Sequence, residues 1–265
     1  GEFEVFYQPI ISLESGEIQE FEALLRWRHP EFGLVAPNEF INVAEETGLI
    51  IPIGKWILEE ACNQTVEWQK RFPAFRDLPV SVNLSAKQLM HPNLTAQVRE
   101  ILFTSKLKPH CLQLEVTEST VMEHHDTAQF VLTQLHELGI HLSTDDFGTG
   151  YSSLSYLHRF PFDRLKIDRS FISKMDSETK SSAIVRTILL LGQNLDIEVV
   201  AEGIENETQL RQLQSLGCGF GQGYLFSKPV PKREAENLLR EGVKNFTVEP
   251  KYVFNLTRKL IEISD

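Results

Sequence analysis

Two adjacent carboxylates, Asp145 and Asp146, stand between an apolar run that ends at Thr144 and the glycine-containing turn at residues 147–150. Neighbouring carboxylates repel each other and lose hydration when their turn is buried, so the arrangement calls for a compensating cation. Asp and Gly are also common turn-forming residues, and for the pair alone an ordinary turn is the better interpretation. A functional site is indicated only if other polar side chains converge on these two aspartates.

The sequence around this pair alternates strand-like and helical segments. Short apolar runs predict strands at residues 4–11, 18–28, 79–83, 112–116, 140–145, 164–168, 197–201 and 220–225. Helical periodicity lies between them, at residues 37–46, 53–71, 126–138, 181–194, 207–216 and up to about residue 105. Repeated strand–helix units with near-continuous apolar strands predict a parallel sheet covered by helices. About eight such strands within one domain length favour an α/β fold closed into a (β/α)8 barrel of the TIM type.

Polar residues stand at the C-terminal ends of these strands, where a strand–helix barrel places its active site. Seven predicted strands supply one: Glu22, Asn83, Glu115, Asp145 with Asp146, Lys166, Glu202 and Gln222. Each residue alone has an ordinary explanation, such as a helix cap for Asn83 or a solvated strand position for Glu22. Seven strands supplying such groups by chance is much less expected, so the set predicts a functional site.

The residue types in this set limit its chemistry. Five carboxylates and an amide oxygen, without Cys or His, are hard ligands that suit Mg²⁺ or Mn²⁺ better than Zn²⁺. Asp145 and Asp146 can bridge and flank two such ions about 3.5–4 Å apart, the geometry used for in-line attack on phosphate esters. A single lysine, Lys166, can orient or deprotonate the attacking water. The pattern predicts a two-metal phosphodiester hydrolase.

Composition narrows the class of partner. A net charge of -11 argues against binding a nucleic acid polymer or an anionic membrane, because both require clustered Lys and Arg. The three cysteines are far apart and form no Cys-x-x-Cys pair, which predicts neither a disulfide framework nor a thiolate metal site. No signal peptide or apolar run near 20 residues is found, so a cytoplasmic, soluble segment is expected. The chain opens without Met, directly in a predicted strand, and we expect sensor, cyclase or membrane-anchoring parts elsewhere in a longer polypeptide.

Eight separated motifs resemble one family. The segment Phe21 to Trp27 contains Glu22-Ala23-Leu24, the signature of EAL-domain proteins, the bacterial cyclic-di-GMP phosphodiesterases. The other motifs follow in the family's order, at residues 7–10, 82–85, 115–118, 145–150, 166–168, 201–205 and 222–224. The resemblance covers about residues 3 to 240 and implies a barrel whose first strand is antiparallel to the rest. It sets the domain at residues 1–244, followed by an extension at 245–265 in which residues 252–263 could form a helix.

The resemblance also implies roles for individual residues. The first of two Mg²⁺ or Mn²⁺ ions would be held by Glu22, Asn83, Glu115 and Asp145, and the second by Asp145 and Asp146 with Glu202 nearby. Lys166 matches the family's general base or water-positioning group, and Glu205 and Gln222 match residues that organise the water shell. The implied substrate-binding residues are Gln8, Leu25, Arg26 and Asp168, with Arg26 facing the phosphate that is not cleaved. Glu118 matches the residue that anchors the 147–153 loop, near which the family forms its homodimer.

The activity implied is hydrolysis of one phosphodiester bond of cyclic-di-GMP to linear 5′-pGpG. An acidic protein can bind this anion only where metal ions and Arg26 reverse the local field. Two alternatives stay open: a receptor that binds cyclic-di-GMP without turnover, and a degenerate scaffold that acts through protein contacts. Every motif position is occupied by a competent residue, which favours the enzyme.

Overall fold

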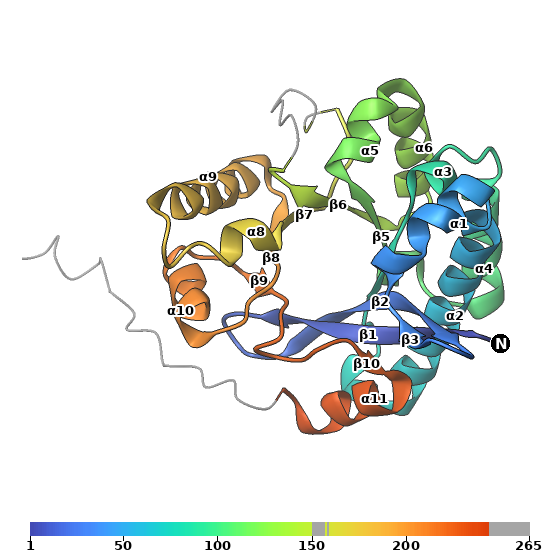
Figure 1. Ribbon diagram of the computed structural model, residues 1–265, viewed down its shortest axis with the longest axis horizontal. Helices are drawn as coiled ribbons and strands as arrows, with labels where there is room; N and C mark the ends of the chain where they lie inside the picture. The colour runs from blue at the N-terminus through green and yellow to red at the C-terminus, as the bar shows by residue number, and fades with distance from the viewer. Residues whose placement is uncertain (150–156, 158, 244–265) are drawn as a thin grey trace, which may run out of the picture.

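Eight strands close into a barrel in a computed structural model that describes residues 1–149, 157 and 159–243 (Figure 1). Around the ring the order is β1, β9, β8, β7, β6, β5, β4, β2, and β2 pairs back with β1. The strands are β1 (Phe3–Ser12), β2 (Ile18–His29), β4 (Val80–Asn83), β5 (Leu112–Thr117), β6 (His141–Phe147), β7 (Arg164–Ile167), β8 (Glu198–Ala201) and β9 (Phe220–Gly221). Two short strands extend the sheet, β3 (Gly33–Val35) beside β2 and β10 (Val230–Pro231) beside β1. The predicted TIM-type barrel is confirmed.

Strand β1 runs antiparallel to both of its ring neighbours, whereas the remaining ring pairs are parallel. Residues 13–17 join β1 to β2 in a tight turn, closed by hydrogen bonds from Ser12 N to Glu17 O (2.9 Å) and from Gly16 N to Ser12 O (2.8 Å). A connection this short cannot make the crossover that parallel strands need. The antiparallel first strand implied by the family resemblance is therefore present.

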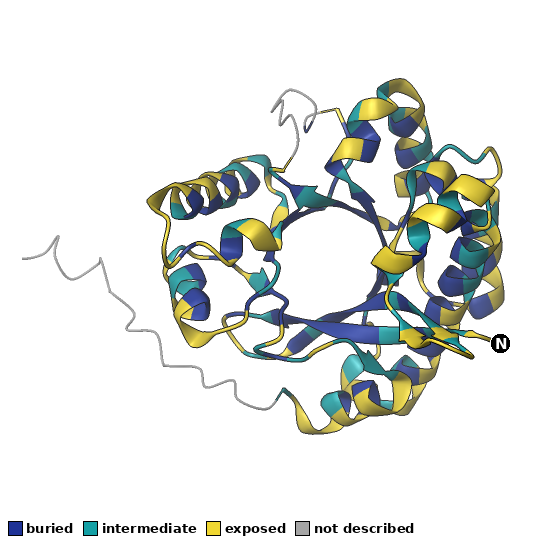
Figure 2. Cartoon of the chain, in the orientation of Figure 1, coloured by how far each residue is buried: buried dark blue, intermediate teal, exposed yellow. Residues whose placement is uncertain are grey.

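Helices surround the barrel, with buried residues on the faces turned towards it and exposed residues on the outer faces (Figure 2). The helices are α1 (Ile41–Thr47), α2 (Ile50–Arg71), α3 (Ala86–Leu89), α4 (Leu94–Ser105), α5 (Glu118–Glu123), α6 (His125–Glu137), α8 (Arg169–Ile172), α9 (Thr179–Leu195), α10 (Glu207–Ser215) and α11 (Lys232–Glu241). None of these helices is long and apolar enough to cross a membrane. The predicted extension at 245–265, with its helix at 252–263, lies outside the described residues.

Three predicted elements differ from those observed, the first being the helix expected at residues 37–46, which is a 3-10 turn at Pro37–Glu39 followed by α1. The helix expected to lead to residue 105 is divided into α3 and α4, because Pro92 lacks an N–H group and disfavours helical backbone at His91. The last strand was expected to reach residue 225 but ends at Gly221. Beyond it the chain turns against the β8–α10 loop, where Leu225 N donates to Ile204 O at 3.0 Å. A Cβ at Gly223 would lie 2.1 Å from Ile204 O, so this close approach requires glycine.

An aromatic cluster fixes the first two strands against α2. Tyr7 of β1 and Phe21 of β2 pack on Trp68, with ring centroids 4.6 Å and 5.3 Å away. All three are almost completely buried. Because side chains alternate along a strand, the next residues, Gln8 and Glu22, point to the opposite face, into the barrel.

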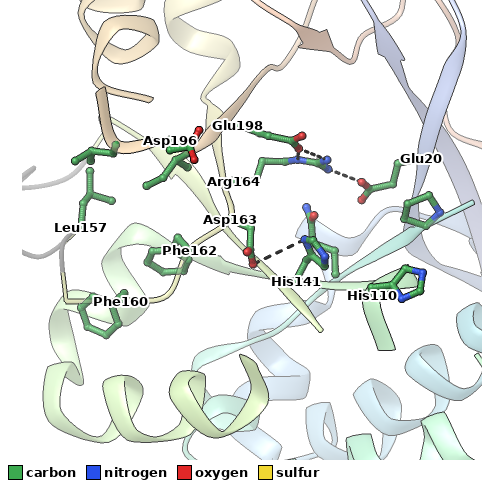
Figure 3. Close-up of a pocket in the computed structure, with 14 residues that line it drawn as sticks. Glu20, His110, His141, Leu157, Phe160, Phe162, Asp163, Arg164, Asp196 and Glu198 are labelled. Carbon is green, nitrogen blue, oxygen red and sulfur yellow. Dashed lines mark hydrogen bonds and ion pairs between the residues drawn. The ribbon is translucent and has the colours of Figure 1, made fainter. Parts of the chain in front are cut away.

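The barrel interior is polar, in contrast to the apolar layer beneath the helices. Along β7, buried Arg164 and Lys166 share one face, and buried Leu165 and Ile167 share the other. Near the N-terminal ends of the strands, Arg164 forms ion pairs with Glu20 of β2 and with Glu198 of β8 (Figure 3). The same face of β7 therefore carries two cations at successive levels, and Lys166 occupies the level nearer the C-terminal ends.

Candidate active site at the C-terminal ends of the strands

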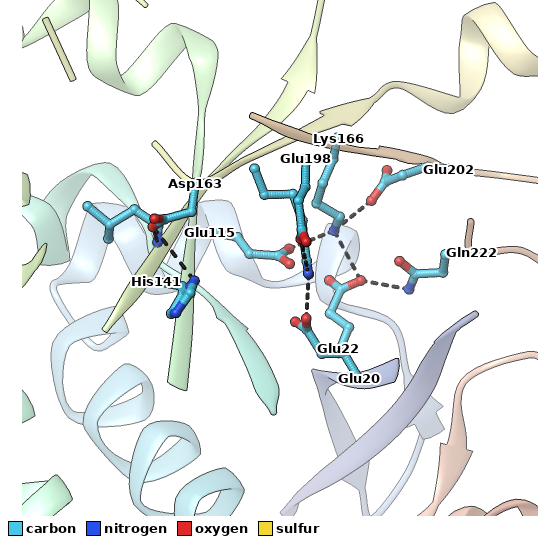
Figure 4. A network of polar contacts seen from close by, with 11 residues as sticks. Glu20, Glu22, Glu115, His141, Asp163, Lys166, Glu198, Glu202 and Gln222 are labelled. Atoms are coloured by element: carbon cyan, nitrogen blue, oxygen red, sulfur yellow. Dashed lines mark hydrogen bonds and ion pairs between the residues drawn. The ribbon is translucent and has the colours of Figure 1, made fainter. Parts of the chain in front are cut away.

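Lys166 stands at the centre of the residues that the sequence predicted to converge (Figure 4). Its Nζ atom lies 2.6 Å from Glu115 Oε2 and 2.6 Å from Glu202 Oε1. Glu22 Oε2 follows at 3.3 Å and Asp145 Oδ1 at 3.9 Å. These carboxylates come from β2, β5, β6 and the residue that follows β8, so barrel closure brings together positions that are distant in sequence.

The charges in this cluster do not balance, since one buried ammonium faces four carboxylates. Burial, with repulsion from Glu22 and Asp145, raises the pKa of Glu115 to about 8. Burial also raises the pKa of Glu202 well above its ordinary value. For Lys166, burial disfavours the charge, but the surrounding carboxylates outweigh it and raise its pKa. Without a further cation, part of the cluster holds protons instead of charge.

Two amides orient Glu22 within the cluster. Asn83 Nδ2 donates to Glu22 Oε1 at 2.7 Å, and Gln222 Nε2 donates to Glu22 Oε2 at 2.7 Å. Gln222 Nε2 also donates to Gln8 Oε1 at 3.0 Å, while Gln8 Nε2 donates to the Ser227 carbonyl at 2.9 Å. Burial opposes ionisation of Glu22, but Lys166 and these amides outweigh it and lower the pKa of the carboxyl. Glu22 is thus held as an anion in a fixed orientation.

Asp145 and Asp146 form a bulge in β6. The register with β7 jumps from Thr144 opposite Leu165 to Phe147 opposite Ile167, so neither aspartate pairs with β7, while Asp145 still pairs with Thr117 of β5. Asp146 adopts a left-handed backbone conformation, with φ of 55°, that non-glycine residues seldom take. Its N–H donates to Asp145 Oδ1 at 2.9 Å. The pair is therefore both a turn and part of the site, and bulges of this kind often aim side chains at active sites.

Asp168 lies beside this bulge and is the N-cap of α8, where its carboxylate accepts from Ser170 N at 3.0 Å. Burial, with the nearby charges of Asp145 and Asp168, raises the pKa of Asp146 to about 6. Asp146 therefore adds to the excess of negative charge at this rim.

Glu118, the first residue of α5, reaches the loop after β6. Its buried Oε2 atom accepts from Gly148 N at 3.0 Å. Gly148 has a φ of 96°, and a Cβ there would lie 3.1 Å from Phe171, so the loop backbone is specific to glycine. The predicted loop anchor and its loop are in contact. Residues 150–153, the remainder of the loop assigned to the homodimer interface, lie outside the described residues.

The predicted substrate-binding residues of β2 lie beyond Glu22 on the same strand. Leu25 is buried and lines an apolar cavity of about 500 Å³ that also reaches Asn83 and Glu115. Arg26 is half-buried; its Nη1 donates to the Leu25 carbonyl at 2.7 Å, and its guanidinium lies 5.6 Å from the centre of the Phe6 ring. Burial lowers the pKa of Arg26 against the opposing effects of Tyr224 and Glu22.

Glu205 differs from the rest of the set because its side chain is exposed, while its N–H donates to Gln209 Oε1 at 2.8 Å. Two further groups were not assigned roles from the sequence. The Ser227 carbonyl, which holds Gln8, leaves no sequence signal because it is a backbone atom. Tyr224 is exposed and lies near enough to Arg26 to affect its charge; its signal was its place in the Gln222-Gly223-Tyr224 motif.

The donor set suits a hard divalent cation. All its atoms are carboxylate or amide oxygens, the negative charge is in excess, and Glu115 Oε1 is buried without a hydrogen-bond partner. The Lys166 ammonium lies between the carboxylates in this arrangement, where it supplies part of the positive charge that they require.

Comparison with known proteins assigns the family. Residues 1–229 match the EAL domain. The bifunctional diguanylate cyclase/cyclic di-GMP phosphodiesterase MucR of Pseudomonas aeruginosa is 47% identical over 233 residues, which cover 88% of this chain and 33% of MucR. The cyclic di-GMP phosphodiesterase NbdA of the same organism is 43% identical over 239 residues, 90% of this chain and 30% of NbdA.

A solved structure agrees with these sequence matches. The PaMucR phosphodiesterase in complex with c-di-GMP superposes with a TM-score of 0.85 at 44% identity, covering 88% of this chain and 94% of that one. The chain spans 28–34% of the length of the first curated relatives that it matches. With its fold, its motifs and these matches, the chain belongs to the EAL domain family.

Proposed function

We propose that this chain hydrolyses one phosphodiester bond of cyclic-di-GMP to linear 5′-pGpG and requires a divalent metal ion. The observation that carries the proposal is the buried cluster of four carboxylates around Lys166, whose excess negative charge calls for cations. Relatives at 43% and 47% identity are named as cyclic di-GMP phosphodiesterases, and a solved relative at 44% identity is a complex with the nucleotide.

Two Mg²⁺ or Mn²⁺ ions per site are part of the proposal. Glu22, Asn83, Glu115 and Asp145 would hold one ion, and Asp145, Asp146 and Glu202 the other. When bound, the ions neutralise the phosphate charge and make water a better nucleophile. Support comes from the all-oxygen donor set and from the partnerless, buried Oε1 atom of Glu115.

Two roles are open for Lys166: a general base or a group that positions the attacking water. With four carboxylates around it the pKa of Lys166 is raised, so the amine is protonated and donates hydrogen bonds instead of accepting a proton. In this state it can orient the attacking water and stabilise negative charge on the phosphate. Cations bound to the same carboxylates would offset their charge and lower the pKa of Lys166, which is the condition under which it could act as a base.

Substrate selection would fall to the residues around the rim. Arg26 offers a half-buried guanidinium for the phosphate that is not cleaved, and a guanidinium suits a phosphate through paired hydrogen bonds. Leu25 lines the cavity of about 500 Å³, a size in the range of small-molecule sites, and its apolar walls suit one face of a base. Gln8 and Asp168 would complete the contacts. Glu205 and Gln222 would organise the water shell of the site.

A cleavage assay separates the three candidate functions. The purified chain is incubated with cyclic-di-GMP and Mg²⁺ or Mn²⁺, and then with excess chelator. Production of 5′-pGpG that stops with chelator supports the enzyme. Binding of the nucleotide without cleavage at any metal concentration overturns hydrolysis in favour of a receptor, and the absence of both favours a scaffold. A metal titration in the same assay tests the preference between Mg²⁺ and Mn²⁺.

The place of this domain in a longer polypeptide, its location and its oligomeric state are also proposals. The chain matches about a third of each curated relative, so sensor or cyclase parts would belong to a longer polypeptide. A domain boundary near residue 244, a cytoplasmic location and a homodimer through the 147–153 loop stay predictions. Light scattering of the purified chain with and without nucleotide would test dimerisation.

A further inference from the structure

A second group of possible metal ligands lies at the opposite end of the barrel. Asp77 precedes β4, and His110 and Cys111 immediately precede β5. One ligand atom from each residue lies within 4.8 Å of the other two. In the part of the chain that the structure describes, this is the one group of three His, Cys, Asp or Glu residues that meets this distance.

The donor types differ from those of the active-site rim. A thiolate, an imidazole and a carboxylate form a mixed set that suits a borderline-soft ion such as Zn²⁺, whereas the rim offers oxygen atoms alone. The Cys111 side chain is buried, and its Sγ donates weakly to the Asp77 carbonyl at 3.6 Å. Binding would replace the thiol proton, so that an S–Zn bond forms and one proton passes to solvent. The cysteine spacing predicted no thiolate metal site, because it contains no Cys-x-x-Cys pair; the present set differs from that prediction in using a single cysteine.

Two basic side chains face the same carboxylate. Lys108 Nζ lies 2.6 Å from Asp77 Oδ1, and Arg76 Nε lies 3.3 Å from Asp77 Oδ2. Their side chains are 60% and 83% exposed, so these pairs are solvent-screened and contribute little stability. Either side chain can turn into solvent and release the carboxylate. Their positive charge nevertheless repels a bound cation, so removing one of these charges should change the affinity of the site for Zn²⁺.

We propose that Asp77, His110 and Cys111 form a Zn²⁺ site, with water as the fourth ligand, that joins the N-terminal ends of β4 and β5. The two strands are neighbours in the barrel, with Val80 paired to Leu112. At their other ends they carry Asn83 and Glu115. An ion that binds the folded chain in preference to the unfolded chain stabilises it by mass action, so Zn²⁺ would stabilise this part of the barrel.

Cobalt spectroscopy of the purified chain tests the site. Co²⁺ replaces Zn²⁺ and gives a thiolate-to-cobalt charge-transfer absorption only where a cysteine is a ligand, so Co²⁺ at the oxygen atoms of the rim does not contribute. We expect the band in the wild-type chain, its loss in C111S, its retention in C218S, and its displacement by Zn²⁺. Because the readout does not involve cyclic-di-GMP, it can fail or succeed independently of the proposed hydrolysis. A wild-type chain without the band, or a C111S variant that keeps it, would overturn the site.

Substitutions at the exposed residues His110 and Lys108 test the site without disturbing the buried core. H110A should weaken the apparent Zn²⁺ affinity by more than about tenfold, since even outer-sphere changes cost about that much. K108M should strengthen it, because the variant removes a competing positive charge from Asp77. An unchanged affinity in H110A, or an unchanged or weaker affinity in K108M, contradicts the proposed ligand set.

Discussion

Strand β7 carries two buried cations on one face, and their surroundings differ (Figures 3 and 4). Arg164 meets two carboxylates, Glu20 and Glu198, the second of which has a 53% exposed side chain. Lys166, two residues further along, meets four, all with side chains no more than 20% exposed. The first cluster is close to charge balance, whereas the second holds more buried negative charge than its one lysine can offset.

The two levels correspond to the two ends of an α/β barrel, of which the N-terminal end supports stability and the C-terminal end supports chemistry. Cavity size does not separate them, because a cavity of about 570 Å³ beside Arg164 exceeds the one of about 500 Å³ beside Glu115. The two levels are separated instead by the imbalance of charge around Lys166. It marks the Lys166 level as the place whose side chains suit a bound cation.

The largest effect is expected from Glu22. Glu22→Ala removes a ligand to the proposed metal and should cost several kcal/mol of transition-state stabilisation, about a thousandfold in kcat. Glu20→Gln is the matched control, because Glu20 lies two residues earlier on the same face of β2 but at the Arg164 level. It should keep kcat within about a factor of ten while lowering stability. Steady-state kinetics and circular dichroism measure both, and near-normal turnover in Glu22→Ala would end the metal assignment.

The second comparison replaces each cation with methionine. Arg164→Met leaves Glu20 buried without a counter-charge, and breaking a buried pair in this way costs about 3–5 kcal/mol. Lys166→Met should destabilise the metal-free chain similarly, but Mg²⁺ or Mn²⁺ should restore its stability by occupying the carboxylates. Denaturant unfolding with and without metal measures the free energies. Metal rescue of both variants, or of neither, would remove the distinction between the two levels.

The third test is pH dependence in the presence of chelator. The pKa of Glu115 is raised from 4.5 to about 8, mainly by burial. Between these values the folded chain keeps a proton that the unfolded chain has released, so the free energy of unfolding should fall as pH rises. For this group the slope is at most about 1.4 kcal/mol per pH unit. Saturating metal replaces the proton and should flatten the slope, as should Glu115→Gln; stability that rises with pH in the metal-free wild type contradicts the charge imbalance.

The sequence predicted the Lys166 level but not the Arg164 level. Glu115 and Lys166 could be assigned because each stands near the C-terminal end of a predicted strand and belongs to a recognisable motif, and Glu22 because it opens the Glu22-Ala23-Leu24 signature. Glu20 and Glu198 resemble solvated strand residues, and their pairing with Arg164 depends on barrel closure across as many as 144 positions. The bulge at Asp145 could not be predicted either, because turn-forming residues do not specify the register between neighbouring strands. Local sequence patterns therefore predicted the candidate catalytic residues, whereas contacts between residues of distant strands could be identified only from the fold.

The smallest expected effect is at Glu118, which supports the rim from outside the cluster. Glu118→Gln keeps an oxygen that can accept from Gly148 N but removes the charge, which should cost about 1 kcal/mol of that hydrogen bond. If the loop helps to hold Asp146 in its left-handed conformation, kcat should fall by about fivefold. Glu137→Gln, at the exposed C-terminal end of α6, is the control and should not change kcat. Equal kinetics in the two variants would show that the Gly148 contact does not support the site, and would limit the functional region to the residues around Lys166.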